Sequence, residues 1–177
     1  MMRSLIRLIV WLMGLGLVVL IGSHWVFSPQ YTVAAEVVIQ MAPERVWAHV
    51  GDLSRWPSWV KGLERFDVVP GTGQGGVTAN ARIYTGFQGI DLVVRVVESL
   101  PDLRLRYEIH GGPQNGVTST IELHPGQDGR STRVRWSESQ TPPGLWGNLK
   151  AAGLKSLVTT HHEESLNQLK FTLERAI

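Results

Sequence analysis

The spacing of apolar residues changes after Pro142-Pro143-Gly144, and this change constrains the fold of the 177-residue chain more than any other feature. Before it, short segments alternate apolar and polar residues, as strands with one buried face do. After it, apolar positions recur at three- and four-residue steps, on a helix about 45 Å long. This stripe contains Ala151, Leu154, Val158, His162, Leu166, Leu169 and Leu173. We therefore expect a β-rich body followed by one long helix that buries one side.

Seven segments are predicted to be strands, and turn residues such as Pro101-Asp102 and Asn115-Gly116 separate them. The segments are residues 32–39, 66–69, 76–84, 90–98, 103–110, 117–124 and 132–140. In the third segment the alternation places Val77, Ala79 and Ala81 on one face. Because short turns join neighbouring segments, we expect an antiparallel meander.

Residues 41–60, MAPERVWAHVGDLSRWPSWV, interrupt this β pattern with two short helices. Pro43 ends the first strand and suits the first turn of a helix, where its missing N–H is not needed. Pro57 opens a second helical turn that carries Trp56 and Trp59.

The pattern A-P-x-x-V-W followed by D-x-x-x-x-P-x-W resembles the START-like superfamily, also called SRPBCC, and within it the polyketide cyclase/dehydrase and lipid-transport branch. The matching positions are Ala42, Pro43, Val46, Trp47, Asp52, Pro57 and Trp59. The resemblance implies an α+β helix-grip fold, in which a seven-stranded curved antiparallel sheet wraps around the long C-terminal helix. It also implies a cavity for an apolar ligand between helix and sheet. Trp47 and Trp59 are interpreted as core aromatic residues that close one end of the sheet.

An apolar segment, residues 8–27, contains no Asp, Glu, Lys or Arg. As a helix it would be about 30 Å long, enough to cross the hydrocarbon core of a membrane. Arg3 and Arg7 precede it and no charge follows until Glu36. The positive-inside rule therefore predicts a single-pass protein with a cytoplasmic N-terminus and an extracytoplasmic domain, periplasmic in a Gram-negative cell.

This segment also allows a second interpretation, a signal peptide cleaved after Val33-Ala34-Ala35. The apolar run is longer than that of a usual signal peptide, and cleavage there would remove half of the first strand. We therefore expect residues 1–30 to be an uncleaved membrane anchor with a short linker, and residues 31–177 to be a START-like ligand-binding domain.

Composition excludes several classes of function. The chain has no cysteine, so disulfides, thiolate metal ligands and cysteine nucleophiles are excluded. The net charge is only +2 and the basic residues are scattered, which does not indicate nucleic-acid binding.

Residues 71–76, GTGQGG, precede an alternating strand rather than a helix and so do not form a dinucleotide fingerprint. The run His161-His162-Glu163-Glu164 lacks metal-ligand spacing, because adjacent helical residues point about 100° apart. No cofactor or metal is predicted, and no protein partner is indicated.

Several polar residues are turned inward by the strand and helix periodicities, and burying them is costly unless they are paired. Three interpretations stay open. In the first, Glu138 reaches solvent at a strand end and His162 is a core residue with satisfied hydrogen bonds. In the second, the polar groups orient a mostly apolar ligand. In the third, His162 and Glu138 act as an acid–base pair on a carbonyl compound. The candidate ligand-binding residues are Tyr107, Ser119, Trp136, Glu138, His162 and Trp59.

The leading hypothesis is membrane-anchored binding, with transport, of a hydrophobic small molecule or lipid. The alternative is an enzyme of the cyclase or dehydratase type, for which no catalytic residue can be assigned from the motif. A third hypothesis is an interaction module with a filled core. Small residues at inward positions, such as Ala79, Ala81 and Ser119, favour the first hypothesis over the third, because they leave space beside the helix.

The predicted topology can be tested with a reporter that is active only outside the cytoplasm. Fused after Ile177, the reporter should be active, because Arg3 and Arg7 hold the N-terminus inside. The protein should stay in the membrane fraction with its N-terminal segment intact. Cytoplasmic reporter activity, or a mature N-terminus at Glu36, would contradict this topology.

Overall fold

A computed structural model describes residues 11–16, 31–69, 77–85, 88–111, 115–140 and 147–175. It contains a seven-stranded antiparallel sheet with the order β1-β7-β6-β5-β4-β3-β2. The strands are β1 (Tyr31–Ile39), β2 (Leu63–Val69), β3 (Thr78–Thr85), β4 (Gln88–Leu100), β5 (Arg104–His110), β6 (Val117–Pro125) and β7 (Thr132–Gln140). Two short helices, α2 (Pro43–Val50) and the 3-10 helix η1 (Leu53–Ser58), follow β1, and α3 (Gly147–Glu174) follows β7. The predicted α+β class, with a seven-stranded antiparallel sheet and a C-terminal helix, is confirmed.

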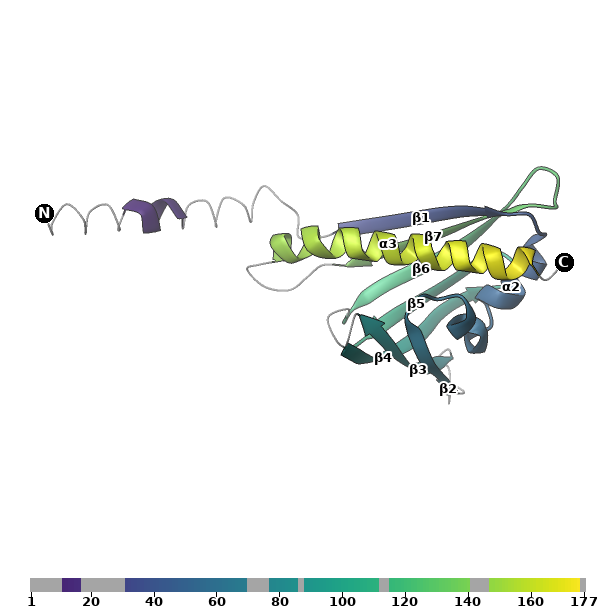
Figure 1. The fold of residues 1–177 in the computed structure, drawn as a ribbon, viewed down its shortest axis with the longest axis horizontal. Coiled ribbons are helices and arrows are strands. Elements are labelled where there is room, and N and C mark those ends of the chain that lie inside the picture. Colours follow the sequence, from purple (N-terminus) through teal and green to yellow (C-terminus); the bar gives the residue numbers. More distant parts are fainter. Residues whose placement is uncertain are drawn as a thin grey trace, which may run out of the picture.

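The sheet is a meander from β2 to β7, and β1 is the one strand that pairs out of chain order. β1 lies beside β7, with Ala35 opposite Trp136. The two short helices then carry the chain from β1 across the concave side to β2 at the other edge (Figure 1). The first and last strands of the domain are therefore neighbours, and α3 returns directly over them.

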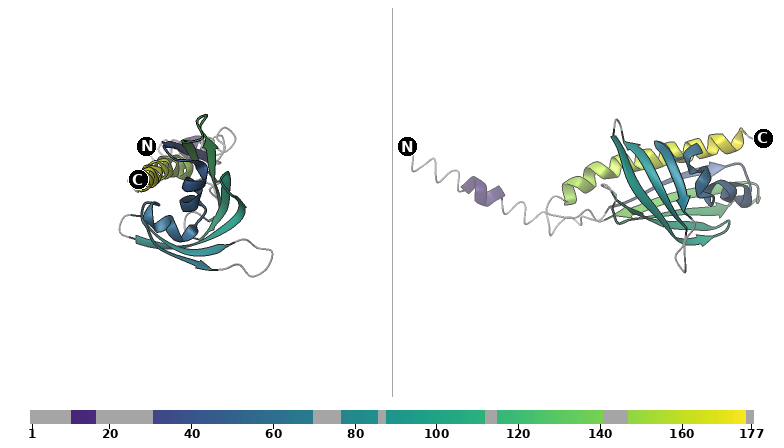
Figure 2. Two further views of the ribbon diagram at one scale, coloured as in Figure 1. Left: turned by 90° about the vertical axis from the view of Figure 1, so that its right-hand side faces the viewer. Right: turned by 90° about the horizontal axis from the view of Figure 1, so that it is seen from below.

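The sheet is strongly curved, and the end-on view in Figure 2 shows it curling around the side that carries the helices. Register shifts occur between Leu63 and Arg65 in β2 and between Val96 and Glu98 in β4. Such bulges bend a strand and increase its twist. The curvature creates a concave surface wider than one helix.

Helix α3 buries one side, as the apolar stripe predicts. Its residues Val158, His162, Leu166, Leu169 and Leu173 are all buried. The main backbone contacts of α3 with the sheet are with β1, and Figure 1 shows the helix lying along that edge. Since α3 follows one edge of the curved sheet, the strands at the opposite edge lie away from the helix.

The short helices carry the aromatic residues that close one end of the sheet. In η1, the Asp52 carboxylate caps the helix by accepting from the Ser54 N–H at 3.0 Å. The Trp56 indole donates to the Val50 carbonyl at 2.9 Å. Trp59 is buried as expected, but Trp47 is only half-buried. The Trp47 ring lies over the Cα of Gly51. The indoles that this segment adds to the core are therefore those of Trp56 in η1 and of Trp59, which follows η1.

One further expectation, the inward orientation of Val77, needs correction. Val77 was expected to point inward, but its side chain is 42% exposed. It precedes β3, which begins at Thr78, so the strand alternation does not extend to it.

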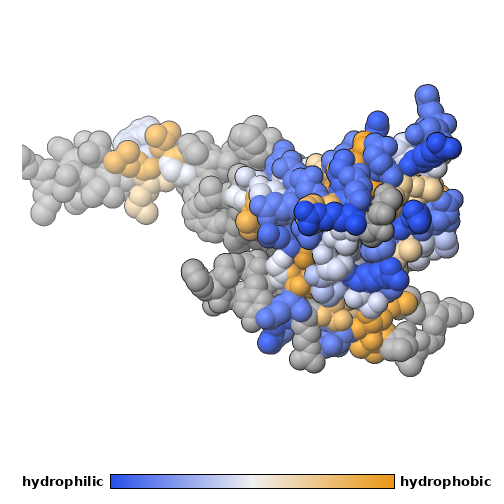
Figure 3. Space-filling model, turned by 45° about the vertical axis from the view of Figure 1, so that its right-hand side comes forward, coloured by the Kyte–Doolittle hydropathy of each residue, from blue (hydrophilic) through white to orange (hydrophobic). Residues whose placement is uncertain are grey.

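Of the predicted membrane segment 8–27, the structure describes residues 11–16, which are helical, and the rest lies outside the described residues. Within the described part of the chain, no helix is long and apolar enough to cross a membrane. On the face shown in Figure 3, hydrophilic side chains predominate among those coloured.

Candidate functional site

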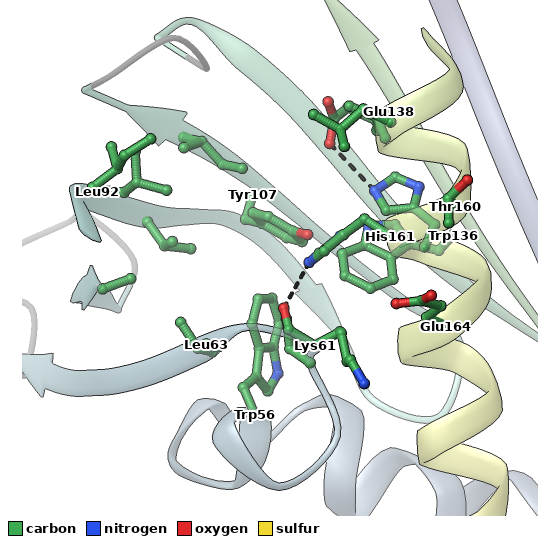
Figure 4. A pocket seen from close by; sticks show the side chains of 18 of the residues that line it. Trp56, Lys61, Leu63, Leu92, Tyr107, Trp136, Glu138, Thr160, His161 and Glu164 are labelled. Carbon is green, nitrogen blue, oxygen red and sulfur yellow. Dashed lines mark hydrogen bonds and ion pairs between the residues drawn. The ribbon is translucent and has the colours of Figure 1, made fainter. Parts of the chain in front are cut away.

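A cavity of about 540 Å³ lies between α3 and the concave surface of the sheet (Figure 4). Its walls come from η1 and the loop after it, from strands β2 to β5 and β7, and from the part of α3 between Leu154 and Glu164. Most of the lining is apolar: Trp56, Val60, Leu63, Phe66, Ala81, Ile90, Leu92, Val94, Tyr107, Ile109, Trp136, Leu154, Leu157 and Val158. The polar lining residues are Lys61, Glu138, Thr160, His161, His162 and Glu164. The cavity therefore suits a mostly apolar molecule.

Glu138 and His162 meet at the buried end of this cavity. Oε2 of Glu138 on β7 lies 3.3 Å from Nε2 of His162 on α3, and the side chains are 3% and 1% exposed. The Trp136 ring stacks on the His162 ring, with centroids 4.2 Å apart and planes at 14°. The stripe of α3 and the alternation of β7 turn these two side chains toward each other, so the helix and the sheet are joined by a polar contact inside the fold.

The sheet register surrounds Glu138 with other polar groups. Tyr107, Ser119 and Glu138 are direct cross-strand neighbours on β5, β6 and β7. The Tyr31 hydroxyl donates to Oε1 of Gln140 at 2.7 Å and lies 3.5 Å from Oε1 of Glu138. Burial, followed by the charge of Glu138, raises the pKa of the Tyr31 phenol to about 12. Burial also raises the pKa of Tyr107 above its usual value, so both phenols stay protonated and keep their donor hydrogens.

The opposite end of the cavity is its mouth, where α3 meets the loop between η1 and β2. Nε2 of His161 donates to the Lys61 carbonyl at 2.9 Å, since a carbonyl only accepts. The Lys61 N–H in turn donates to the Ser165 hydroxyl at 3.0 Å. Burial lowers the pKa of the His161 imidazole. These bonds fasten the loop to α3, while the side chains of Lys61, Leu157 and Glu164 remain exposed around the opening.

Four of the six predicted site residues line the cavity: Tyr107, Trp136, Glu138 and His162. Ser119 and Trp59 lie behind the wall. The Ser119 hydroxyl accepts from the Trp136 indole at 2.8 Å, and Trp59 packs edge-on against Trp136 at 5.7 Å. The interpretation that Glu138 reaches solvent is wrong, because the 3% exposed side chain faces α3.

Sequence reasoning did not identify Tyr31, Lys61 or His161 as parts of this region. Tyr31 continues the alternation of Val33 in β1 and could have been found from that pattern. His161 carries no such signal, because its role depends on a loop a hundred residues away in the chain. Within the part of the chain that the structure describes, no group of three His, Cys, Asp or Glu side chains is arranged to hold a metal ion.

The sequence profile of a family described as polyketide cyclase / dehydrase and lipid transport matches residues 30–174. Among solved structures, TTHA0849 from Thermus thermophilus has a TM-score of 0.69 and 21% identity, covering 82% of this chain and 99% of that chain. The Zhui aromatase/cyclase from a Streptomyces species has a TM-score of 0.70 and 15% identity, covering 82% and 94%. The di-domain ARO/CYC StfQ, from the steffimycin biosynthetic pathway, has a TM-score of 0.67 and 12% identity, covering 83% and 51%. At these identities the similarity shows a shared fold. No match was found among curated proteins.

The raised pKa of Tyr31 predicts a pH dependence of stability. Above pH 10 the phenol ionises in the unfolded chain but stays protonated in the folded protein until about pH 12. The unfolded state then binds fewer protons, so the free energy of unfolding should fall as pH rises through this window. Urea unfolding measured across the window should show a less steep fall for Tyr31→Phe than for wild type. Equal slopes would contradict the assignment.

Proposed function

We propose that this chain, which belongs to the polyketide cyclase/dehydrase and lipid transport family, binds one hydrophobic small molecule or lipid in the cavity under α3. The observation that carries this proposal is the combination of an apolar cavity of about 540 Å³ with a single buried polar end. A cavity of this size falls within the range of small-molecule sites. Large apolar voids are rare in well-packed cores, which argues against a module with a filled interior.

Membrane anchoring through residues 8–27 is the second part of the proposal. Four peptide steps separate Phe27 from Tyr31, and an extended chain spans at most about 14 Å over that distance. Tyr31 and Val33 pack against Leu154 and Val158, and these two residues of α3 also line the cavity. An anchored domain would thus hold this side of the cavity close to the extracytoplasmic surface of the bilayer. Leu157, which is 59% exposed, gives the cavity mouth an apolar rim. Uptake and release of a membrane lipid, and hence transport, would follow from this placement.

A second candidate function is acid–base catalysis on a bound carbonyl compound. The observation that favours it is the contact between His162 and Glu138, both of which line the cavity. An imidazole oriented by a carboxylate can move a proton at a ligand atom within hydrogen-bond reach. In the cyclase or dehydratase hypothesis, His162 would take a proton from a carbon next to the carbonyl, and Glu138 would stabilise the imidazolium that forms.

Filling the cavity should abolish binding without unfolding the domain. Ala81 lines the cavity, so Ala81→Phe should remove most of the uptake of a neutral apolar fluorescent probe by residues 31–177. Overpacking should cost about 1 to 3 kcal/mol of stability. Ala34→Phe adds the same side chain on the exposed face of β1 and serves as the matched control. Unchanged probe binding by a folded Ala81→Phe variant would refute the binding site.

Binding and catalysis are separated by His162→Gln. If His162 only orients a ligand, the variant should lose about 1 to 3 kcal/mol of affinity or stability, and neither protein should convert a linear poly-β-ketone. If His162 moves a proton, turnover of that compound should fall about 100-fold or more while its affinity is nearly unchanged. We expect the first pattern. Conversion by wild type that disappears in a folded, ligand-binding His162→Gln variant would establish the enzyme instead.

A further inference from the structure

We infer that the buried end of the cavity selects a ligand whose polar group is a neutral hydrogen-bond donor, such as a hydroxyl, and excludes carboxylate or phosphate head groups. This inference rests on the proposed binding function and names the chemical class of the ligand. It follows from the hydrogen-bond acceptor capacity of Glu138 and from the absence of a Lys or Arg beside Glu138 among the described residues that line the cavity.

Glu138 has free capacity to accept hydrogen bonds inside the cavity. A carboxylate accepts about four hydrogen bonds and donates none. Among the described residues, the polar contacts of the Glu138 carboxylate are with the His162 imidazole at 3.3 Å and the Tyr31 hydroxyl at 3.5 Å. Both distances are at or beyond the long end of the usual range, and the short bond of Tyr31 goes to Gln140 at 2.7 Å. A ligand hydroxyl at this wall would supply the short, charge-assisted bond that Glu138 does not form with any residue in the described ranges.

No permanent cation accompanies Glu138 at this end. Among the described residues that line the cavity, Lys61 is the one Lys or Arg, and its side chain is exposed at the mouth. Figure 4 shows Glu138 and Lys61 on opposite sides of the pocket, with Trp136 and His161 between them. His162 is already turned to Glu138. An anionic head group at the buried end would therefore meet a like charge without a counter-ion, in a site from which water is largely excluded.

The same arrangement fixes the orientation of a hydroxyl ligand. Its polar group would lie at Glu138, and its apolar body would extend toward Leu92, which lines the cavity on the side away from α3 (Figure 4). Among the described residues that line the cavity, Lys61 is the Lys or Arg side chain with which an anionic ligand could pair, in the reversed orientation and with its head group exposed. The two orientations differ in whether Glu138 affects binding.

The test uses the full-length chain in phosphatidylcholine nanodiscs and three photoactivatable probes. The probes share a dodecyl chain with a mid-chain diazirine and end in a hydroxyl, a carboxylate or a methyl group. At matched probe concentration, cross-linking to peptides of β4 and β5 should be about ten- to a hundredfold higher for the hydroxyl probe than for the methyl probe. The carboxylate probe should label no better than the methyl probe.

The matched variants are Glu138→Gln and Glu163→Gln. Each removes one carboxylate, but Glu163 is on the exposed side of α3 and does not line the cavity. In Glu138→Gln the advantage of the hydroxyl probe over the carboxylate probe should fall about tenfold or more, because a neutral amide both donates and accepts. Labelling by the methyl probe should be unchanged, which shows that the cavity of the variant is intact. Glu163→Gln should label as wild type does.

The possible outcomes separate this inference from the function it rests on. If no probe labels the cavity in wild type, the proposed binding function fails. If all three probes label equally, or if the carboxylate probe labels best and is unaffected by Glu138→Gln, binding stands and the selectivity inferred here is wrong. Should Glu138→Gln fail to fold, the ratio of hydroxyl to carboxylate labelling in wild type still decides the question.

Discussion

The packing of α3 along β1 is the interaction on which the rest of the structure depends. The helix buries a continuous stripe from Val158 to Leu173, and its main backbone contacts with the sheet are with this one strand. The sheet is bent by bulges in β2 and β4 and is wider than one helix can cover. The C-terminal half of α3 joins the main core, whereas Leu154 and Val158 earlier in the helix pack with Tyr31 and Val33. The cavity is therefore a consequence of fitting one helix to one side of a strongly curved sheet.

The polar contact between Glu138 and His162 is hard to explain by stability alone. Two charged or polar groups lose their water in this position, and replacing such a buried pair by apolar residues is often neutral or stabilising. Here the pair lies in the wall of a cavity and keeps unused acceptor capacity. The Trp136 indole stacks on the His162 imidazole and helps to hold it in place. These features suit a site that fixes the polar end of an otherwise apolar ligand.

Sequence periodicity predicted the elements of this fold and part of its site, because strand and helix alternation determines which side chains point inward. It placed Glu138 and His162 on inward faces, and the structure brings them into contact. It could not place His161 against Lys61, because that bond depends on how a loop meets α3. It also assigned a core role to Trp47, whereas the 3-10 geometry of η1 turns Trp56 inward instead. Periodicity in the sequence predicts which face of a strand or helix is buried. It does not predict which residues of distant elements come into contact.

Native mass spectrometry of the full-length protein released from membrane nanodiscs tests the central claim most directly. We expect a population with one added mass, which fragmentation identifies as an apolar compound that carries a neutral hydroxyl or another hydrogen-bond donor. This added mass should be lost when the cavity is filled. A protein that carries no added mass after release from its native membrane would rule out the binding site, and one that carries only fatty acids or phospholipids would rule out the selectivity for a neutral donor.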